Sequence, residues 1–239
     1  MPKGSPTRKA RKQEAAVRRL SRELLLACND ALLARLGPQG WWPGESALEV
    51  CVGAVLTQNT AWRNVEPVIE RLRGRGLIDA ARLAATPEDE LASLLRGAGY
   101  HNQKARTLLA FARLLAGDFG SDLAAMLGGD LRCARRRLLS VKGIGPETAD
   151  SMLLYAGERP VFVIDAYTRR FLARHGLIAG SESYEQVQGL FVQALPASIA
   201  LFKEFHALVV ALCKGFCAAR YPRCDACPLL PVLGSPENP

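Results

Sequence analysis

Residues 141–150 of the chain read VKGIGPETAD, and this stretch decides the fold class. Glycine adopts positive φ at no steric cost, so Gly143 and Gly145 allow the chain to reverse tightly. Pro146 suits the first position of a helix, where its missing N–H costs nothing. Apolar residues recur at helical spacing on both sides of the turn. The stretch therefore predicts a helix, a short hairpin and a second helix over about 134–157.

The hairpin is also a candidate anion site. A helix that starts directly after a turn with few side chains leaves backbone N–H groups open to an anion. Lys142 stands in the turn, and arginines at positions 132, 135, 136 and 137 precede it. The pattern indicates phosphate binding at Lys142, Gly143 and Gly145. The alternative is a capping glycine beside a solvated basic face, and the basic run makes phosphate binding the stronger interpretation.

Net charge and composition favour a polyanionic partner. The 239 residues include 31 Lys and Arg against 23 Asp and Glu, which gives a net charge of +8, and 49% are hydrophobic. Such a chain can bury a sizeable core and attracts nucleic acid. It has no apolar run of about 18 residues and no apolar segment near its start, so we expect neither a transmembrane helix nor a secretory signal. We expect a cytoplasmic monomer that is nucleoid-associated when it binds nucleic acid.

Helical periodicity dominates the chain, and alternating strand patterns are nearly absent. We predict an all-α protein of two helical lobes. The central lobe covers 44–158 and ends with the hairpin, and the second lobe combines 15–43 with 159–239. Residues 1–14 are basic and polar, and we predict a disordered arm there. Punctuation by Gly, Pro, Asn and Asp separates helices predicted at about 15–36, 46–59, 61–74, 87–97, 101–117, 130–141, 146–157, 165–175, 183–195 and 198–213.

Four of the seven cysteines crowd into residues 213–227 with the spacing Cys-x3-Cys-x6-Cys-x2-Cys. Four thiolates on a short loop suit a tetrahedral metal or an iron–sulfur cluster, and a proline directly after the last cysteine is typical of ferredoxin-type runs. The spacing alone does not distinguish an iron–sulfur cluster from a zinc site. Disulfides are a much weaker alternative in a chain without a secretory signal. The predicted ligands are Cys213, Cys217, Cys224 and Cys227. The isolated Cys28, Cys51 and Cys133 are expected to be buried thiols.

Together, these motifs resemble the helix-hairpin-helix DNA glycosylase superfamily. Asp165 follows the hairpin, twenty residues after Gly145, as in that family's pattern. The spacing from Cys217 through Cys224 to Cys227 is similar to three of the four cluster ligands in the endonuclease III branch. The segment GAVLTQNT at 53–60 resembles the one with which that branch enters the duplex. The resemblance runs from about residue 41 to residue 228. It implies two all-α lobes with DNA lying across the cleft that separates them.

Two positions depart from the endonuclease III pattern. Leu233 stands where a fourth cluster cysteine is expected, and Cys213 is the upstream replacement. With that replacement we expect a [4Fe–4S] cluster in preference to zinc. Glu147 stands where bifunctional members carry the lysine that forms a Schiff base with the sugar. The resemblance therefore implies a monofunctional glycosylase that cuts the base–sugar bond and leaves the strand intact.

By the same resemblance, Asp165 is the catalytic carboxylate. Cleavage of an N-glycosidic bond builds positive charge on the deoxyribose, and a nearby carboxylate stabilises that charge and orients or deprotonates the attacking water. Aspartate is also a favoured helix N-cap, and both roles can hold at one residue. The alternative from another functional class is a non-catalytic DNA-binding module with a structural cluster. Asp165 at the family spacing argues against it.

The chain is similar in particular to the helix-hairpin-helix 3-methyladenine DNA glycosylases, at residues 41–43 (WWP), 53–60 (GAVLTQNT) and 99–105 (GYHNQKA). This likeness implies an alkylated purine such as 3-methyladenine. Thymine or uracil from mismatches, or an oxidised pyrimidine, is the alternative. The implied pocket for the flipped base, which needs stacking walls, is formed by Trp41, Trp42, Pro43 and Leu48.

Each of these assignments has a plainer reading. One of the two adjacent tryptophans can be structural, because neighbouring positions of a helix point in different directions. Leu48 departs from the aromatic residue that other members carry near this position. Gln58 is implied to fill the gap left by the flipped base, and its plainer reading is a polar residue at a helix end.

Overall fold

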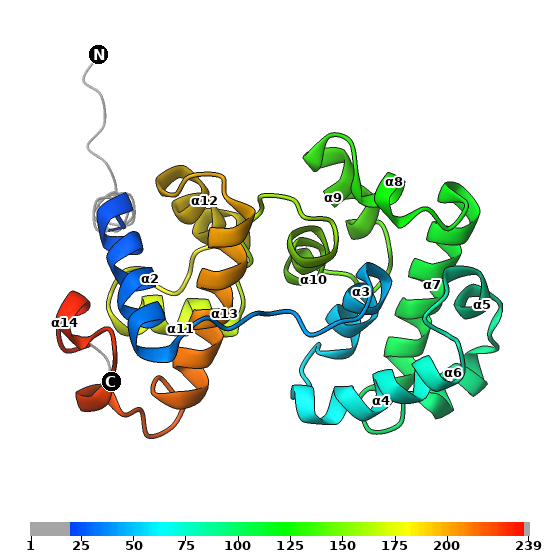
Figure 1. Cartoon of the computed structure of the whole chain (residues 1–239), viewed down its shortest axis with the longest axis horizontal. Coiled ribbons are helices and arrows are strands. Elements are labelled where there is room, and N and C mark those ends of the chain that lie inside the picture. Colours follow the sequence, from blue (N-terminus) through cyan, green and yellow to red (C-terminus); the bar gives the residue numbers. More distant parts are fainter. Residues whose placement is uncertain (1–19, 237–239) are drawn as a thin grey trace, which may run out of the picture. The chain divides into compact units, whose positions relative to one another are not determined.

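The computed structural model describes residues 20–236 (Figure 1). These residues form helices and no β-strand, which confirms the all-α prediction. No helix among them is long and apolar enough to span a membrane. The predicted disordered arm, residues 1–14, lies outside the described residues. Trp42–Arg159 forms one compact unit, and the described residues before and after it form the other.

The unit Trp42–Arg159 is organised around a buried central helix, α3. Apart from Glu49, its sequence is apolar all round, as expected of a helix covered on every side. Helix α3 packs against α4, α7, α10 and η1. The helices of this unit are α3 (Ala47–Leu56), α4 (Trp62–Gly74), α5 (Ala80–Ala85), α6 (Glu88–Leu94), α7 (His101–Phe119), α8 (Leu123–Leu127), α9 (Leu131–Leu139), α10 (Pro146–Ser151) and the π-helical turn η1 (Met152–Ala156).

Two short helices of this unit, α5 and α8, escaped the sequence analysis. Each is too short to show a clear apolar period, since one or two turns give only a few positions to compare. Their starts were nevertheless readable, because Asp79 and Asp122 occupy the N-caps. Each carboxylate accepts a hydrogen bond from the backbone N–H three residues later.

The second unit is organised around the long helix α13, which packs against α2 and α11. Four phenylalanines form part of its core, and the rings of Phe162 and Phe191 stack with their centroids 4.1 Å apart. The helices of this unit are α2 (Arg22–Leu36), α11 (Ala166–Arg174), α12 (Tyr184–Ala194), α13 (Ile199–Gly215), the 3-10 turn η2 (Cys224–Ala226) and α14 (Leu230–Leu233).

The apolar stretch VFVI at 161–164 is buried and forms neither a helix nor a strand, and Asp165 joins it to α11. Two side chains hold its backbone. Gln188 Nε2 donates to the carbonyl of Phe162 at 2.7 Å, and the N–H of Ile164 donates to the Tyr184 hydroxyl at 3.3 Å. Side chains of helix α12 thus form hydrogen bonds with the backbone of this segment, as a neighbouring strand would in a sheet. The first residue after it is Asp165, whose position is therefore fixed by the core.

Candidate active site

Asp165 is the N-cap of α11, and two groups hold its carboxylate. Oδ1 accepts a hydrogen bond from the Thr168 N–H at 2.7 Å, and Oδ2 lies 3.4 Å from Nε2 of His206 on α13. Asp165 is 8% exposed and His206 is 3% exposed. Aspartate suits this position because its carboxylate satisfies an N–H that the first helical turn leaves open. The residue therefore has the capping role that the sequence allowed, at a point where two helices meet.

The surroundings of Asp165 act on its pKa in opposite directions. Burial raises the pKa, because a charged carboxylate loses its hydration. The hydrogen bond and charge of His206, with the Thr168 N–H, lower the pKa and prevail, so that it lies below its ordinary value. Asp165 is therefore an ionised carboxylate at neutral pH although it is nearly buried. This charge state stabilises a cation and is unsuited to donating a proton.

An indole ring lies next to this pair. Trp41 stacks on the imidazole of His206, with ring centroids 5.7 Å apart and ring planes at 20°. Lys214, also on α13, places Nζ 5.9 Å from the centroid of the Trp41 ring. The N–H of Gln39 donates to Oε1 of Glu204 at 2.7 Å, which fixes the segment before the indole to the same helix. Helix α13 thus places a predicted pocket residue beside the predicted catalytic carboxylate.

His206 was missed by the sequence analysis. It is a single histidine in the apolar stretch FHALVVALC, where a histidine is easily read as a core residue. No spacing rule connects it to Asp165, since the pair forms only because α13 packs against α11. The one available signal was that a polar ring on the buried face of a helix needs a polar partner.

Trp42 belongs to the other unit, since the chain divides directly before it. Its ring meets Trp62 edge-on at a centroid distance of 6.0 Å and an angle of 89°, and it lies 5.5 Å from the ring of Tyr155. Trp62, at the start of α4, is thus an aromatic neighbour of Trp42 that the sequence analysis did not single out.

The packing of Trp42 gives a reason for the glycine in the GAVLTQNT motif. A Cβ at Gly53 would lie 3.1 Å from Nε1 of Trp42, which is tighter than most such contacts. Glycine lets the indole pack directly on α3. Pro43 is exposed and Leu48 is partly buried. The base-pocket role of Trp42, Pro43 and Leu48 stays a prediction.

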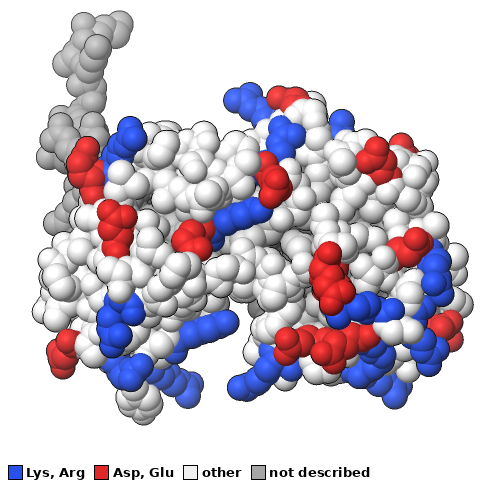
Figure 2. All heavy atoms as spheres, viewed as in Figure 1, with Lys and Arg blue, Asp and Glu red and all other residues white. Residues whose placement is uncertain are grey.

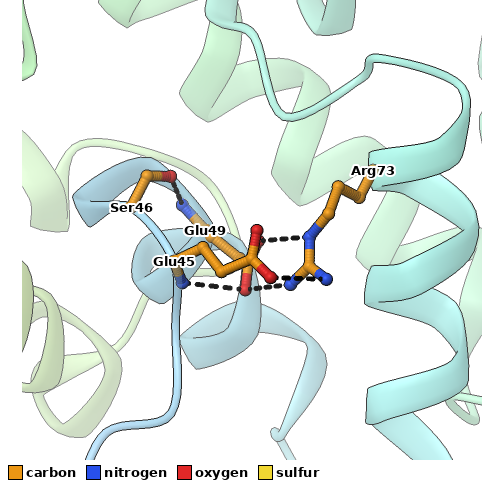
Figure 3. A network of polar contacts seen from close by, with 4 residues as sticks. All are labelled: Glu45, Ser46, Glu49 and Arg73. Atoms are coloured by element: carbon orange, nitrogen blue, oxygen red, sulfur yellow. Dashed lines mark hydrogen bonds and ion pairs between the residues drawn. The ribbon is translucent and has the colours of Figure 1, made fainter.

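A polar network fixes the start of α3 (Figure 3). The Ser46 hydroxyl caps the helix by accepting the Glu49 N–H at 3.2 Å. Arg73 of α4 donates to both oxygens of Glu49 at 3.1 and 2.8 Å, and it also pairs with Glu45 at 3.0 Å. A two-pronged arginine–carboxylate pair fixes orientation as well as charge. The network joins α3 to α4. It therefore fixes the two helices that hold the Trp42–Trp62 pair, because Trp42 packs on α3 and Trp62 starts α4.

The two glycines of the hairpin have different roles. Gly143 has φ +97°, and a Cβ there would overlap the side chain of Thr107, so only glycine fits. Gly145 has φ −93°, and no atom lies within 4 Å of where its Cβ would be. Positive φ is therefore needed only at Gly143, contrary to the expectation from sequence. Gly145 and the exposed Lys142 present an open backbone and an ammonium at the start of α10.

Gln58 is bound to this hairpin. Its Nε2 donates to the carbonyl of Gly143 at 3.0 Å and to the Thr148 hydroxyl at 2.9 Å. The next residue, Asn59, has φ +51°, so the turn after α3 is sharp. The predicted insertion of Gln58 into the duplex would require both hydrogen bonds to break.

Lys104, near the start of α7, is a buried cation that forms hydrogen bonds with the turn after α3. Its Nζ donates to the carbonyls of Leu56 and Ala98 at 2.8 and 2.6 Å and to the Thr60 hydroxyl at 2.8 Å. Burial lowers the pKa of Lys104 to about 8. The side chain thus joins the end of α3, the turn that carries Gln58 and the segment before α7.

Two arginines of the basic run are used inside the protein. Arg135 donates to both oxygens of the fully buried Asp150 at 2.7 and 3.1 Å, which joins α9 to α10. Arg137 donates to three backbone carbonyls at the end of α8. Arg135 and Arg137 are thus engaged within the protein, whereas Arg132 and Arg136 are exposed. The face drawn in Figure 2 likewise carries basic and acidic side chains interspersed.

The cysteine-rich segment, residues 213–227, turns three of its thiols toward one cavity. Cys217, Cys224 and Cys227 line this cavity. Nη1 of Arg174 donates to Cys217 Sγ at 3.1 Å. The pKa of the Cys217 thiol is lowered to about 6 by its hydrogen bond with Cys213, which outweighs the effect of burial, and by Arg174. Three thiols around one cavity form a donor set that suits an iron–sulfur cluster or zinc, and the neighbouring Arg174 offsets the negative charge of a thiolate.

The remaining thiols are placed differently. Cys213 is buried on α13, and its Sγ donates to the carbonyl of Tyr167 at 3.4 Å. Cys28 and Cys51 are buried as predicted, whereas Cys133 is only partly buried. In the described part of the chain no three His, Cys, Asp or Glu side chains already converge on one metal position. Binding of a cluster therefore requires the cavity thiols to converge.

Comparison with known proteins agrees with this geometry. The family model described as HhH-GPD superfamily base excision DNA repair protein matches residues 52–197. The chain belongs to the HhH-GPD family of base excision repair DNA glycosylases. The matched region of this HhH-GPD protein contains the second half of the buried helix α3, the hairpin and Asp165. The predicted family is confirmed.

Individual relatives support the same assignment. The chain is 40% identical to "Putative DNA repair glycosylase MJ1434" of Methanocaldococcus jannaschii over 208 residues, 87% of this chain and 94% of that protein. The H. pylori 3-methyladenine DNA glycosylase MagIII, solved with 1,N6-ethenoadenine bound, is 29% identical with a TM-score of 0.67, and the match covers 81% of this chain and 96% of that one. A non-covalent endonuclease III–DNA complex, 21% identical, shares the fold with a TM-score of 0.76 over 89% and 95% of the chains.

Proposed function

We propose that this HhH-GPD protein is a monofunctional DNA glycosylase. It flips an alkylated purine such as 3-methyladenine out of double-stranded DNA and hydrolyses the bond between base and sugar. The observation that carries the proposal is the nearly buried, ionised carboxylate of Asp165. Thr168 and His206 hold it in place, and the Trp41 ring lies against the same histidine.

The carboxylate is suited to the charge that develops in this reaction. As the base departs, positive charge builds on the deoxyribose, and a fixed anion in a nearly buried site stabilises it without reorganising. Asp165 can also orient or deprotonate the attacking water. Its lowered pKa makes it a poor acid, so it offers little help to a leaving base that needs a proton. A purine that already carries positive charge from alkylation needs that help least, which supports this substrate class.

Recognition of the base rests on the aromatic residues. An electron-poor purine stacks well on an indole face, and Trp41 offers such a ring beside Asp165. The Lys214 ammonium also lies over the Trp41 ring, so a cationic base that stacks on the face occupied by Lys214 has to displace it. Trp42 and Trp62 form a separate aromatic group within the unit Trp42–Arg159. The likeness to the H. pylori 3-methyladenine DNA glycosylase supports the same class of base.

Binding to the DNA backbone is assigned to the hairpin. Gly145 leaves space beside its backbone, and the exposed Lys142 adds a positive charge at the start of α10. Backbone N–H groups at such a helix start bind phosphate oxygens without reading the sequence. The hairpin therefore fixes the enzyme on the duplex, and the aromatic residues select the base.

The absence of strand cleavage is a separate part of the proposal. Glu147 lies in the first turn of α10, and a carboxylate cannot form a Schiff base with the sugar. Lys214 is an amine in the group around Trp41, so its participation has to be tested directly. Borohydride trapping should give no covalent DNA adduct with the wild type, and the Lys214→Ala variant should behave identically.

The decisive experiment is base release from methylated duplex DNA, with chromatographic identification of the freed base and a parallel nicking gel without alkali. Release of 3-methyladenine without nicks is expected. The Asp165→Asn variant should bind the duplex as the wild type does and release no base. If protein that binds DNA releases no methylated base, the alkylpurine proposal fails, and mismatched thymine or uracil and oxidised pyrimidines become the substrates to assay. If none of these is released, the chain is a DNA-binding module.

We also propose that the cysteine-rich segment holds a [4Fe–4S] cluster. Three thiols line one cavity, and Arg174 offsets negative charge at Cys217, as the thiolate ligands of a cluster require. When bound, the cluster would tie the chain after α13 into a fixed loop. Catalysis is assigned to Asp165, and the cluster takes no part in it.

A further inference from the structure

We propose that His175, rather than Cys213, is the fourth ligand of this cluster, which gives a Cys3His set with Cys217, Cys224 and Cys227. The inference rests on the proposed [4Fe–4S] cofactor and is independent of the glycosylase activity. It assigns a function to a histidine that neither the hairpin nor the group around Asp165 uses.

The first observation is that all four proposed ligand residues line the same cavity. His175 lies directly after α11, at its C-cap, whereas the three cysteines follow α13. The cavity therefore joins two segments that are about forty residues apart in the sequence. Apolar residues, among them Phe216 and Leu230, complete the wall, as suits a cluster shielded from water.

The second observation concerns the imidazole of His175. Its Nδ1 is buried, and no described residue forms a hydrogen bond with it. A buried nitrogen without a partner is costly, and in native proteins such atoms call for an explanation. A metal ion is a natural partner, because neutral imidazole nitrogen is a common ligand for iron and zinc.

The third observation is that Cys213 is engaged elsewhere. Its Sγ donates to the carbonyl of Tyr167 at 3.4 Å, and it does not belong to the cavity wall. Cys213 also forms a hydrogen bond with Cys217, one of the proposed cluster ligands. Cys213 is therefore a positioning residue for Cys217 in this arrangement.

The C-terminal segment explains why a replacement ligand is needed. Helix α14 ends at Leu233, the position where the endonuclease III pattern has its fourth cysteine, and Gly234 lines the cavity. The chain thus passes the cavity at the expected place without a thiol. His175, which approaches from α11, supplies the missing donor. Replacement of a thiolate by a neutral imidazole makes the cluster less negative and raises its reduction potential.

The test compares anaerobically purified wild type with His175→Ala, His175→Cys and Cys213→Ser. Iron, acid-labile sulfide and zinc are quantified, the oxidised samples are examined by electron paramagnetic resonance, and reduction potentials are measured by voltammetry. Circular dichroism verifies that each variant is folded. Base release is measured on the same samples, so that failure of the glycosylase proposal is seen separately.

We expect a full [4Fe–4S] complement in the wild type and in Cys213→Ser. His175→Ala should lose the cluster or show the signal of a three-iron form. His175→Cys should keep the full complement at a lower reduction potential, and this variant decides the matter if His175→Ala does not fold. The proposal is overturned if Cys213→Ser loses iron while His175→Ala keeps it, or if His175→Cys has the wild-type potential. Zinc without iron in the wild type would overturn it as well.

Discussion

His206 is expected to set the acid limit of the reaction through Asp165. In the His206→Leu variant the carboxylate loses the partner that lies 3.4 Å from its Oδ2 and keeps the burial that raises its pKa. A hydrogen bond to a charged group contributes about 1.5–3 kcal/mol, and one pKa unit corresponds to about 1.4 kcal/mol. The measured separation is longer than the usual range for an N–H···O bond, which favours the low end. We therefore expect the pKa of Asp165 to rise in this variant, because burial then acts on the carboxylate with less opposition.

The sign follows from the charge that the reaction needs. Base release requires the ionised carboxylate, so activity is lost as the pH falls through the pKa of Asp165. A higher pKa moves this acid limb of the pH–rate profile toward neutral pH, and the rate at neutral pH falls less than the rate in acid. His206→Gln keeps an N–H donor in a similar position and should move the limb less.

The assay is single-turnover release of 3-methyladenine from duplex DNA across the acidic range. A blank without enzyme corrects for spontaneous depurination. The Asp165→Asn variant gives the rate of base release that remains without the catalytic carboxylate. Circular dichroism at each pH separates loss of activity from unfolding. An acid limb that stays at the wild-type position in His206→Leu would refute the role of His206. Equal shifts in the Leu and Gln variants would show that stacking on Trp41, and not the hydrogen bond, is the property that matters.

Four further expectations concern the unit Trp42–Arg159. Gly143→Ala should lower the free energy of unfolding by about 1–3 kcal/mol, because alanine is strained at φ +97° and meets Thr107. Gly145→Ala should keep the stability and weaken DNA binding, and a filter-binding titration that finds equal affinities would contradict the open-backbone contact. Arg135→Ala should cost about 3–5 kcal/mol in urea unfolding, because it leaves the buried Asp150 without its cation, while the exposed Arg132→Ala serves as the neutral control. Lys104, with its pKa lowered to about 8, releases its proton in the folded state at lower pH than in the unfolded chain. Wild-type stability should therefore rise between about pH 8 and pH 10 by up to about 3 kcal/mol relative to Lys104→Met, and parallel curves would count against a buried ammonium.

Much of the fold could be read from local patterns. The hairpin, its flanking helices and the all-α class followed from glycine, proline and apolar spacing, because these features act over a few residues. Asp165 could be recognised as a helix cap from its own neighbourhood. The short helices α5 and α8 were missed since they contain too few turns to show a period. The π-helical turn Met152–Ala156 extends α10 in a form that no residue type specifies.

The candidate site was predictable only in part, because its residues meet through packing. The sequence by itself determined the hairpin and the carboxylate. It also determined that three cysteines share one short loop, since each of these depends on neighbours along the chain. Only the tertiary structure decided that His206 faces Asp165 and that Trp62 meets Trp42. Only the tertiary structure likewise decided that Arg135 pairs with the buried Asp150 and that His175 lines the cavity with the cysteines. The physical reason is that helices far apart in sequence pack by the shape of their apolar faces. That packing sets which polar side chains become neighbours, and the neighbours then set charge state and chemistry.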